Sequence, residues 1–516
     1  MGATIPVVPN PSWRLPMRKT LFATAALAAL AFAGAASAQN AHTYTIQTNN
    51  AGQNSTLRLD SIRVGSNLTG SATSIGNIID ISVPTTNTNQ AIAELNSGNG
   101  LGSGPQFNNG AQTSNLSAIN VAAPGRSDLN STSAGNVVNL EGQLITQRGN
   151  ATFSQINNGP APTTYTYPGG SYTFQNPAQS ANLNVSGGSY GEIEGSAGAI
   201  GNILSAEGGT VLLTPARIGS TATANNYIPT DVLGQAQTNN GAQYADVYVS
   251  RTSFATGSFD GQAVGNSTSI DASLVANVGG HQTNNGAQQT SVNLNFVSSP
   301  GATSVNGLSI GNSTAADAPT VTVNGYSDGF GRGDSSIRQI NNTGQSTNVT
   351  VNSSNLDRVN ASAASVGNIL SLTGGSVAIA GSNSQVNNGF QQSSLSFNNV
   401  VSPGTSSLSS QTVGNVLPLT LTGGASFGFD QTNNAGQNSY LNVNNGSFGT
   451  VNASSLSMAN SASIVAPTGF IGGMNQTNNA GQFSTTNVNF ASFSNLTAGA
   501  ASVGNSFSVT TGPARP

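Results

Sequence analysis

The side chains best able to do chemistry in this chain are amides, and they recur at a regular spacing. A Gln-x-Asn-Asn element occurs nine times, and in most copies a second Gln follows, as in Gln47-Thr48-Asn49-Asn50-Ala51-Gly52-Gln53. An amide both donates and accepts, so stacked Gln and Asn can bond to identical copies above and below, where Lys or Asp would repel its own image. The predicted ladder residues are Gln47, Asn50, Gln53, Gln237, Asn240, Gln243, Gln282, Asn285, Gln288, Gln385, Asn388, Gln431, Asn434, Gln437, Gln476, Asn479 and Gln482.

A second element, Gly-Asn, follows the first Gln of each unit after 28 or 29 residues, except in the third unit, where the distance is 46. One copy reads Ala459-Asn460 instead. Glycine and asparagine tolerate positive φ, which favours turns at these sites. The predicted turn residues are Gly76, Asn77, Gly265, Asn266, Gly367, Asn368, Gly414, Asn415, Gly504 and Asn505.

The longer third unit contains a Pro- and Tyr-rich insertion at residues 159–177, after which Ala178-Gln179 resumes the interrupted element. Four aromatic residues lie inside it. Exposed rings there would bind carbohydrate or a partner surface, and rings packed onto the flank of the array would be structural. The aromatic residues are Tyr165, Tyr167, Tyr172 and Phe174.

Catalytic residue types are scarce. Residues 39–516 contain no Cys, no Lys and two His, of which His281 is expected to be a solvated turn residue and His42 lies near the start. Glu192 and Glu194 lie two apart, on one face of an extended strand, where they form either an acid pair for glycoside chemistry or an exposed polar face. Asp residues fall at unmatched positions of the units, which argues against a repeated metal site. We therefore predict no enzyme, no cofactor and no bound metal.

The start of the chain predicts export. Arg18-Lys19 precede an apolar run that ends in Ala36-Ser37-Ala38, the pattern of a cleaved signal peptide. We assign residues 17–38 to that peptide, 1–16 to a misassigned start, and 39–516 to the repeat region without a membrane-spanning segment. Residues 39–516 carry ten Arg against 17 Asp and Glu, a net charge of −7, which offers no basic surface for nucleic acid or anionic lipid.

Between the two elements, apolar and polar residues alternate, as in Val292, Leu294 and Phe296, and no helical period appears in residues 39–516. Alternation with period two predicts half-buried strands, about four short ones per unit. The fold class is therefore all-β: a β-solenoid or stacked β-sheet array of about nine Gln/Asn-rich repeats.

The segment 431–443, Gln-Thr-Asn-Asn-Ala-Gly-Gln-Asn-Ser-Tyr-Leu-Asn-Val, resembles the strand-turn-strand repeats of curlins, the amyloid fibre subunits of bacteria. A signal peptide followed by Asn/Gln-rich repeats is also similar to the surface proteins that anchor the holdfast of stalked alphaproteobacteria. Undisturbed units here are 45 to 46 residues, about twice a curlin repeat, so two curlin-like turns per unit would reconcile the lengths. The resemblance implies secretion through the outer membrane of a Gram-negative bacterium and assembly at its surface.

These observations predict a secreted or surface-exposed structural protein that assembles by β-stacking for attachment or biofilm formation. Its expected partners are further copies or related surface subunits, the outer-membrane export machinery and extracellular polysaccharide. A monomeric glycan-binding adhesin that uses the insertion 159–177 is the first alternative. A β-helical polysaccharide-processing enzyme that uses Glu192 and Glu194 is the second.

Overall fold

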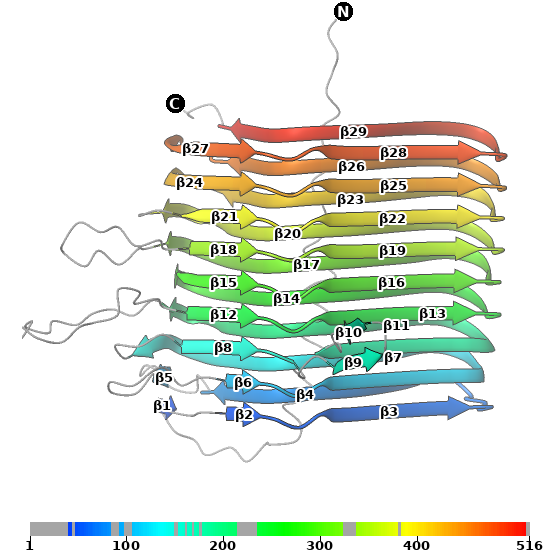
Figure 1. The fold of residues 1–516 in the computed structure, drawn as a ribbon, viewed down its shortest axis with the longest axis horizontal. Coiled ribbons are helices and arrows are strands. Elements are labelled where there is room, and N and C mark those ends of the chain that lie inside the picture. The colour runs from blue at the N-terminus through cyan, green and yellow to red at the C-terminus, as the bar shows by residue number, and fades with distance from the viewer. Residues whose placement is uncertain are drawn as a thin grey trace, which may run out of the picture. The chain divides into compact units, whose positions relative to one another are not determined.

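A computed structural model describes residues 40–43, 47–83, 92–96, 106–148, 153–159, 163–167, 170–174, 178–213, 235–323, 337–379 and 383–511. All of them belong to the compact unit Gln39–Pro516. The described residues are built from strands, and no helix among them is long and apolar enough to cross a membrane. The predicted all-β class is confirmed, and the chain forms a parallel β-solenoid (Figure 1). The predicted signal peptide lies outside the described residues.

Each predicted unit forms one coil, so nine coils stack along the array, numbered 1 to 9 by their first Gln from Gln47 to Gln476. The Gln of one coil pairs with the Gln of the next, as Gln237 does with Gln282. The alternative of two turns per unit is therefore wrong. The Gln-x-Asn segments are β2 (Gln47–Asn49), β6 (Gln106–Asn108), β8 (Phe153–Asn157), β12 (Gln235–Asn239), β15 (Gly280–Asn284), β18 (Ile337–Asn341), β21 (Ser384–Asn387), β24 (Ala425–Asn433) and β27 (Phe470–Asn478).

An eight-residue strand and a long strand complete each coil, in place of the four short strands expected. Every strand pairs in parallel with its equivalents in the neighbouring coils. In coils 2 and 3 the two strands are continuous, as β7 (Gln112–Arg148) and β11 (Gln179–Leu212). The other eight-residue strands are β3 (Gln53–Asp60), β13 (Gln243–Ser250), β16 (Gln288–Asn295), β19 (Gln345–Asn352), β22 (Gln391–Asn398), β25 (Gln437–Asn444) and β28 (Gln482–Asn489). The other long strands are β4 (Leu68–Ser82), β14 (Ser253–Asn277), β17 (Ser298–Val323), β20 (Asn355–Ile379), β23 (Val401–Leu421), β26 (Ser447–Val465) and β29 (Ser492–Thr510).

Two short strands lie beside the first coils. β1 (Asn40–Thr43) pairs in parallel with β5 (Ile92–Asn96), which in turn pairs with the end of β7. These pairings extend the stack on the side where the chain passes from one coil to the next.

In every coil the residue directly after the eight-residue strand segment has a left-handed backbone. Its φ lies between 48° and 67° in all nine coils. A positive φ redirects the chain into the long strand, at a cost that is low for Gly and Asn and higher for Arg or Phe. The nine residues are Ser61, Asn120, Gly187, Arg251, Phe296, Ser353, Asn399, Asn445 and Phe490.

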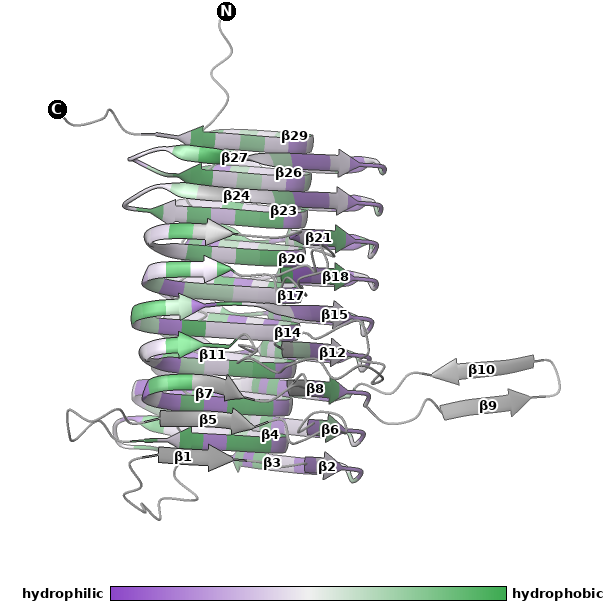
Figure 2. Cartoon of the chain, turned by 90° about the vertical axis from the view of Figure 1, so that its left-hand side faces the viewer, coloured by the Kyte–Doolittle hydropathy of each residue, from purple (hydrophilic) through white to green (hydrophobic). Residues whose placement is uncertain are grey.

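The interior consists of two apolar regions with amides between them. One region fills the space between the eight-residue strands and the first half of the long strands, with Val292, Leu294 and Val305 as typical members. The other lines the second half of the long strands and the residues that lead to the next Gln, including Ala316 and Val321. Figure 2 shows the apolar and hydrophilic segments of successive coils lying in line. Each coil thus buries its apolar side chains against the apolar side chains at the equivalent positions of its neighbours.

The insertion in the third unit forms a hairpin of its own. β9 (Thr163–Tyr167) and β10 (Gly170–Phe174) pair antiparallel, with Tyr165 opposite Tyr172, in a separate two-stranded sheet. Directly after it, Gln179 pairs with Gln112 and Gln243 of the neighbouring coils, so the repeat resumes in register. The predictions about the aromatic side chains at 165, 167, 172 and 174 lie outside the described side chains.

Candidate functional site

The first Gln of each unit forms a ladder along the whole stack. Each Nε2 donates to Oε1 of the Gln one coil nearer the N-terminus, at 2.8–3.0 Å. The same Nε2 also donates across the interior to a backbone carbonyl just after the Gly-Asn element, at 2.7–3.2 Å. Both amide hydrogens are therefore used in coils 2 to 9. These glutamines join neighbouring coils and also hold the long strand against the Gln-x-Asn segment.

The first Asn of the element, which the predicted ladder set omitted, forms a second ladder. Asn49 donates to Oδ1 of Asn108 at 2.8 Å, and the pattern continues to Asn478 with distances of 2.7–2.9 Å. Period-two alternation could have found it, because Gln47 and Asn49 share a strand face and Asn50 does not. The ladder residues are Asn49, Asn108, Asn157, Asn239, Asn284, Asn341, Asn387, Asn433 and Asn478.

The second Gln forms a third ladder, at 2.7–2.9 Å, and exchanges two further hydrogen bonds with the first Asn of its own coil. In coil 5, Asn284 Nδ2 donates to Gln288 Oε1 at 2.8 Å and Gln288 Nε2 donates to Asn284 Oδ1 at 3.0 Å. Asn284 is fully buried and Gln288 nearly so. The pair therefore leaves no amide group of these ladders unpaired in the interior, where an unpaired one would cost about 1–3 kcal/mol.

The second Asn of the element forms a ladder on the outside of the stack. Asn109 donates to Asn50 Oδ1 at 2.8 Å, and the series reaches Asn479 at 2.7–2.8 Å. Its members are exposed except Asn109 and Asn240, which are partly buried. The predicted ladder residues Asn50, Asn240, Asn285, Asn388, Asn434 and Asn479 all belong to it. Because water competes for exposed amides, this ladder contributes less to stability than the buried ones.

The Gly-Asn elements lie inside the long strands instead of at turns. Gly76, for example, falls within β4, and none of the five glycines predicted as turns, Gly76, Gly265, Gly367, Gly414 and Gly504, has a positive φ. The buried side chains switch from one strand face to the other there: in β26 the buried row runs through Ser455 and Ser457, and after Ala459 it continues through Asn460 and Ala462. Inward and outward side chains alternate along the strand, and the Gly-Asn element shifts this alternation by one residue without ending the strand. The Asn that follows each glycine thus points inward.

These asparagines form the fifth ladder. Asn77 donates to Asn136 Oδ1 at 2.8 Å, and the same distance recurs at every step to Asn505. The preceding glycine has little room, since a Cβ on Gly76 would lie 2.5 Å from Asn108 Oδ1 and 2.6 Å from the Gly135 carbonyl. The predicted residues Asn77, Asn266, Asn368, Asn415 and Asn505 therefore belong to a ladder, and the glycine provides space for the next coil.

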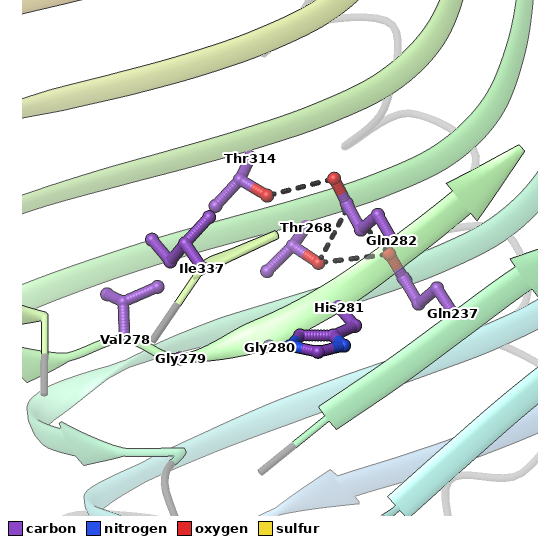
Figure 3. A pocket seen from close by; sticks show the side chains of 9 residues that line it. All are labelled: Gln237, Thr268, Val278, Gly279, Gly280, His281, Gln282, Thr314 and Ile337. Atoms are coloured by element: carbon purple, nitrogen blue, oxygen red, sulfur yellow. Dashed lines mark hydrogen bonds between the residues drawn. The ribbon is translucent and has the colours of Figure 1, made fainter. Parts of the chain in front are cut away.

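His281 lies within β15, partly buried, instead of in a solvated turn. It lines a cavity of about 20 Å³ together with Gln237, Gln282, Thr268 and Thr314 (Figure 3). The threonines extend the Gln ladder: Thr268 Oγ1 donates to Gln237 Oε1 at 3.1 Å, and Thr314 Oγ1 donates to Gln282 Oε1 at 3.1 Å. The cavity has room for about one water molecule. It is too small for a sugar ring.

Glu194 lies on the outer face of β11 and is ion-paired. Arg126 Nη2 contacts Glu194 Oε2 at 2.7 Å, and Arg126 Nε contacts Asp128 Oδ1 at 2.9 Å. The hydrogen bond to Asp128, followed by the charge of Glu194, raises the pKa of Arg126. Glu192, two residues before Glu194, is exposed. The arrangement is a surface ion-pair network joining coils 2 and 3, and such networks contribute little to stability.

Four carboxylates lie one above another, and two of them, Asp271 and Asp317, correct the prediction that Asp residues fall at unmatched positions. Glu141 pairs with Glu207, Glu207 with Asp271, and Asp271 with Asp317. Each acid lies six residues after the glycine of its Gly-Asn element. The distance from each acid to the next Gln varies, because loops of different length lie between them, so alignment on the Gln does not reveal the match. Among the described residues, no group of three or more Asp, Glu, His or Cys is arranged to hold a metal ion.

Coil 9 lacks a covering coil among the described residues. Leu496 is 42% exposed and Val509 37%, whereas Val451 and Ile464, their counterparts in coil 8, are 0% exposed. The backbone groups along this edge of β27, β28 and β29 pair only with coil 8. An unpaired parallel edge with exposed apolar rows is a template for another strand layer.

The chain matches no family model, no curated protein and no solved structure.

Proposed function

We propose that this chain is an exported, non-enzymatic structural protein of the bacterial surface, which assembles by β-stacking of its solenoid and serves attachment. The observation that carries the proposal is the exposed end at coil 9. A soluble monomer normally protects such an edge with charges, Pro or a covering element. Here the exposed row includes Leu496, Phe507 and Val509.

The repeat also supports assembly, because the contacts that join any two coils are available for joining two chains. Neighbouring coils are linked by five amide ladders and by apolar rows of the same residue types. Strand layers about 4.8 Å apart can continue from one copy into the next without a change of geometry. A fibre formed in this way would present the outer Asn ladder and the hairpin β9–β10 at regular intervals.

A monomeric glycan-binding adhesin is the second candidate, favoured by the hairpin. β9 and β10 form a sheet that shares no pairing with the solenoid, as a separate binding element would. In that case the solenoid positions the hairpin and self-association is absent. Removing the hairpin would then abolish attachment, whereas assembly would be retained under the leading proposal.

The experiment is thioflavin binding and electron microscopy of residues 39–516 at neutral pH, with two matched double variants. Ala498 and Ala500 continue the inward row of coil 8, where their partners are Ala453 and Ser455, and Thr497 and Gly499 lie on the outward face of the same strand; residues 497–500 are all exposed. Glu at both inward positions would bury unpaired charges on assembly, at several kcal/mol, whereas Glu at both outward positions would remain in water.

We expect fibrils from the wild type and from Thr497→Glu/Gly499→Glu, and none from Ala498→Glu/Ala500→Glu. Persistent monomers of the wild type with a strong β-sheet signal would refute assembly and favour the monomeric adhesin.

A further inference from the structure

We infer that assembly is polar: coil 9 of one copy docks on coil 1 of a second copy, in the register that continues all five ladders. This inference rests on the proposed function and specifies its contact. It follows from the direction of the amide hydrogen bonds and from the matched side-chain rows of the two end coils.

The direction of hydrogen bonding is constant along each ladder. In three ladders, represented by Gln106, Gln112 and Asn109, the amide nitrogen donates toward the N-terminal end. In the other two, represented by Asn49 and Asn77, it donates toward the C-terminal end. The two ends of the solenoid therefore present opposite atoms.

Coil 9 directs three acceptors and two donors toward a following coil. The acceptors are the side-chain oxygens of Gln476, Gln482 and Asn479, whose nitrogens already donate to coil 8. The donors are the nitrogens of Asn478 and Asn505, whose oxygens already accept from coil 8.

Coil 1 presents the complementary set. The nitrogens of Gln47, Gln53 and Asn50 carry the donor hydrogens directed away from coil 2, because the oxygens accept from coil 2. The oxygens of Asn49 and Asn77 are the acceptors on that side, because the nitrogens donate to coil 2. Each of the five positions therefore pairs a donor with an acceptor when coil 9 meets coil 1. Two identical ends can meet only with their strands antiparallel. In that arrangement the amides of each ladder no longer lie opposite the equivalent amides of the other copy.

Gly504 has more room around it than the equivalent glycines of coils 1 to 7. In coils 1 to 7 a Cβ at the equivalent glycine would collide with the next coil, as at Gly311, where Asn341 Oδ1 and the Gly367 carbonyl would each lie 2.5 Å away. At Gly504 the nearest atom to such a Cβ is Asn478 Nδ2, at 3.5 Å, so the single chain does not require glycine there. A second copy stacked on coil 9 would fill this space, because its Asn49 and Gly76 would take the places of Asn341 and Gly367. Coil 8 has Ala459 at the equivalent position beneath coil 9, so a methyl group is accommodated there, and a larger side chain is needed to block stacking.

The remaining inward rows of coils 9 and 1 match in type. In the continued register Leu496 would face Leu68, Val488 would face Leu59, and Ser502 would face Ser74. Ala500 would face Ala72 and Val509 would face Ile81. Apolar side chains would thus be buried against apolar ones, as between coils within the chain.

The test uses two variants of residues 39–516, each blocked at one end. The C-blocked variant carries Ala500→Glu and Gly504→Val. The N-blocked variant carries Asn50→Asp and Ser55→Glu, since Ser55 is a partly exposed inward residue of β3. Thr56→Glu, on the outward face of β3, is the control for the N-blocked end, and circular dichroism verifies that each variant folds.

Sedimentation velocity should show each blocked variant monomeric on its own and their equimolar mixture as a one-to-one dimer. Dimers of the N-blocked variant alone would overturn polarity in favour of joining through two C-terminal ends, and dimers of the C-blocked variant alone would favour two N-terminal ends. Fibres from a chain blocked at both ends would overturn the inference in favour of lateral association and leave the proposed function intact. A wild-type chain that remains monomeric would overturn both.

Discussion

Asn157 and Gln179 are separated by 22 residues in the sequence, yet they exchange two amide hydrogen bonds of 2.8 and 3.0 Å. In the uninterrupted units the equivalent residues are four apart, as Asn239 and Gln243 are. The hairpin is thus inserted into one ladder step without disturbing it.

Deleting residues 160–177 should leave the solenoid intact. The deletion joins Gly159 to Ala178 and restores Asn-Asn-Gly-Ala-Gln, the sequence of residues 239–243. Because a shorter loop costs less conformational entropy to close, we expect an unchanged or slightly higher midpoint of thermal unfolding. Circular dichroism melts would measure it. A drop of more than about 5 °C would mean that the hairpin supports the fold.

Charge in a buried ladder should be far more damaging than charge in the exposed one. Asn284→Asp removes the donors to Gln288 and Asn341 and leaves a carboxylate in the interior, at a cost of about 3–5 kcal/mol. Asn285→Asp, one residue later in the exposed ladder, should cost less than about 1 kcal/mol. Denaturant titration of the two variants gives both values. Equal losses would contradict the assignment of Asn284 to the interior.

Tyr190→Phe should stabilise the chain. The Tyr190 ring is buried, its hydroxyl has no hydrogen-bond partner among the described residues, and burial raises the pKa of Tyr190 to about 12. Phe254 occupies the equivalent position one coil later, so a phenyl ring fits there. Removing a buried, unpaired hydroxyl should gain about 1 kcal/mol, measurable by denaturant unfolding. A loss of stability would show that the hydroxyl is bonded.

Asp260→Asn should raise stability at neutral pH but not at acidic pH. Burial raises the pKa of Asp260, while hydrogen bonds from Asn306 and Ser258 partly oppose the rise. Since the folded pKa exceeds the unfolded value, the stabilising contribution is complete below the unfolded pKa and is lost as pH rises through the folded pKa. The variant should therefore have a higher thermal midpoint than the wild type at pH 7, and the difference between the two proteins should be smaller at pH 3. A larger difference at pH 3 would contradict a raised pKa for Asp260.

The repeat made the fold class and three of the five ladders predictable, because a fixed spacing of amides implies that identical residues stack. The asparagines of the Gly-Asn elements were assigned to turns instead. The repeat defines the units, but it does not say which face of its strand each Asn occupies. Deciding whether an Asn points inward or outward requires the phase of the strand alternation. Asn49 was omitted for that reason, and Asn50, although a ladder residue, lies outside.

Other features gave no sequence signal. The left-handed position is occupied by residues as different as Arg251, Phe296 and Gly187, so composition does not mark it. Gly-Asn favoured a turn by local propensity, but the next coil overrides that propensity by requiring the space in front of the glycine. The acidic column Glu141 to Asp317 became visible only once residues were aligned from Gly-Asn, because variable loops follow it.

The central claim, that copies stack end to end in ladder register, is tested most directly by a disulfide across the junction. The chain has no cysteine. In Asn50→Cys/Asn479→Cys, both in the exposed ladder, stacking would bring the Cα atoms of the two cysteines of successive copies one strand spacing apart, about 4.8 Å, within the Cα–Cα range for a disulfide. Oxidation after assembly should give a series of covalent multimers on a non-reducing gel, whereas Asn50→Cys/Asn285→Cys should not. Fibres that yield no multimers from the first pair would contradict end-to-end stacking.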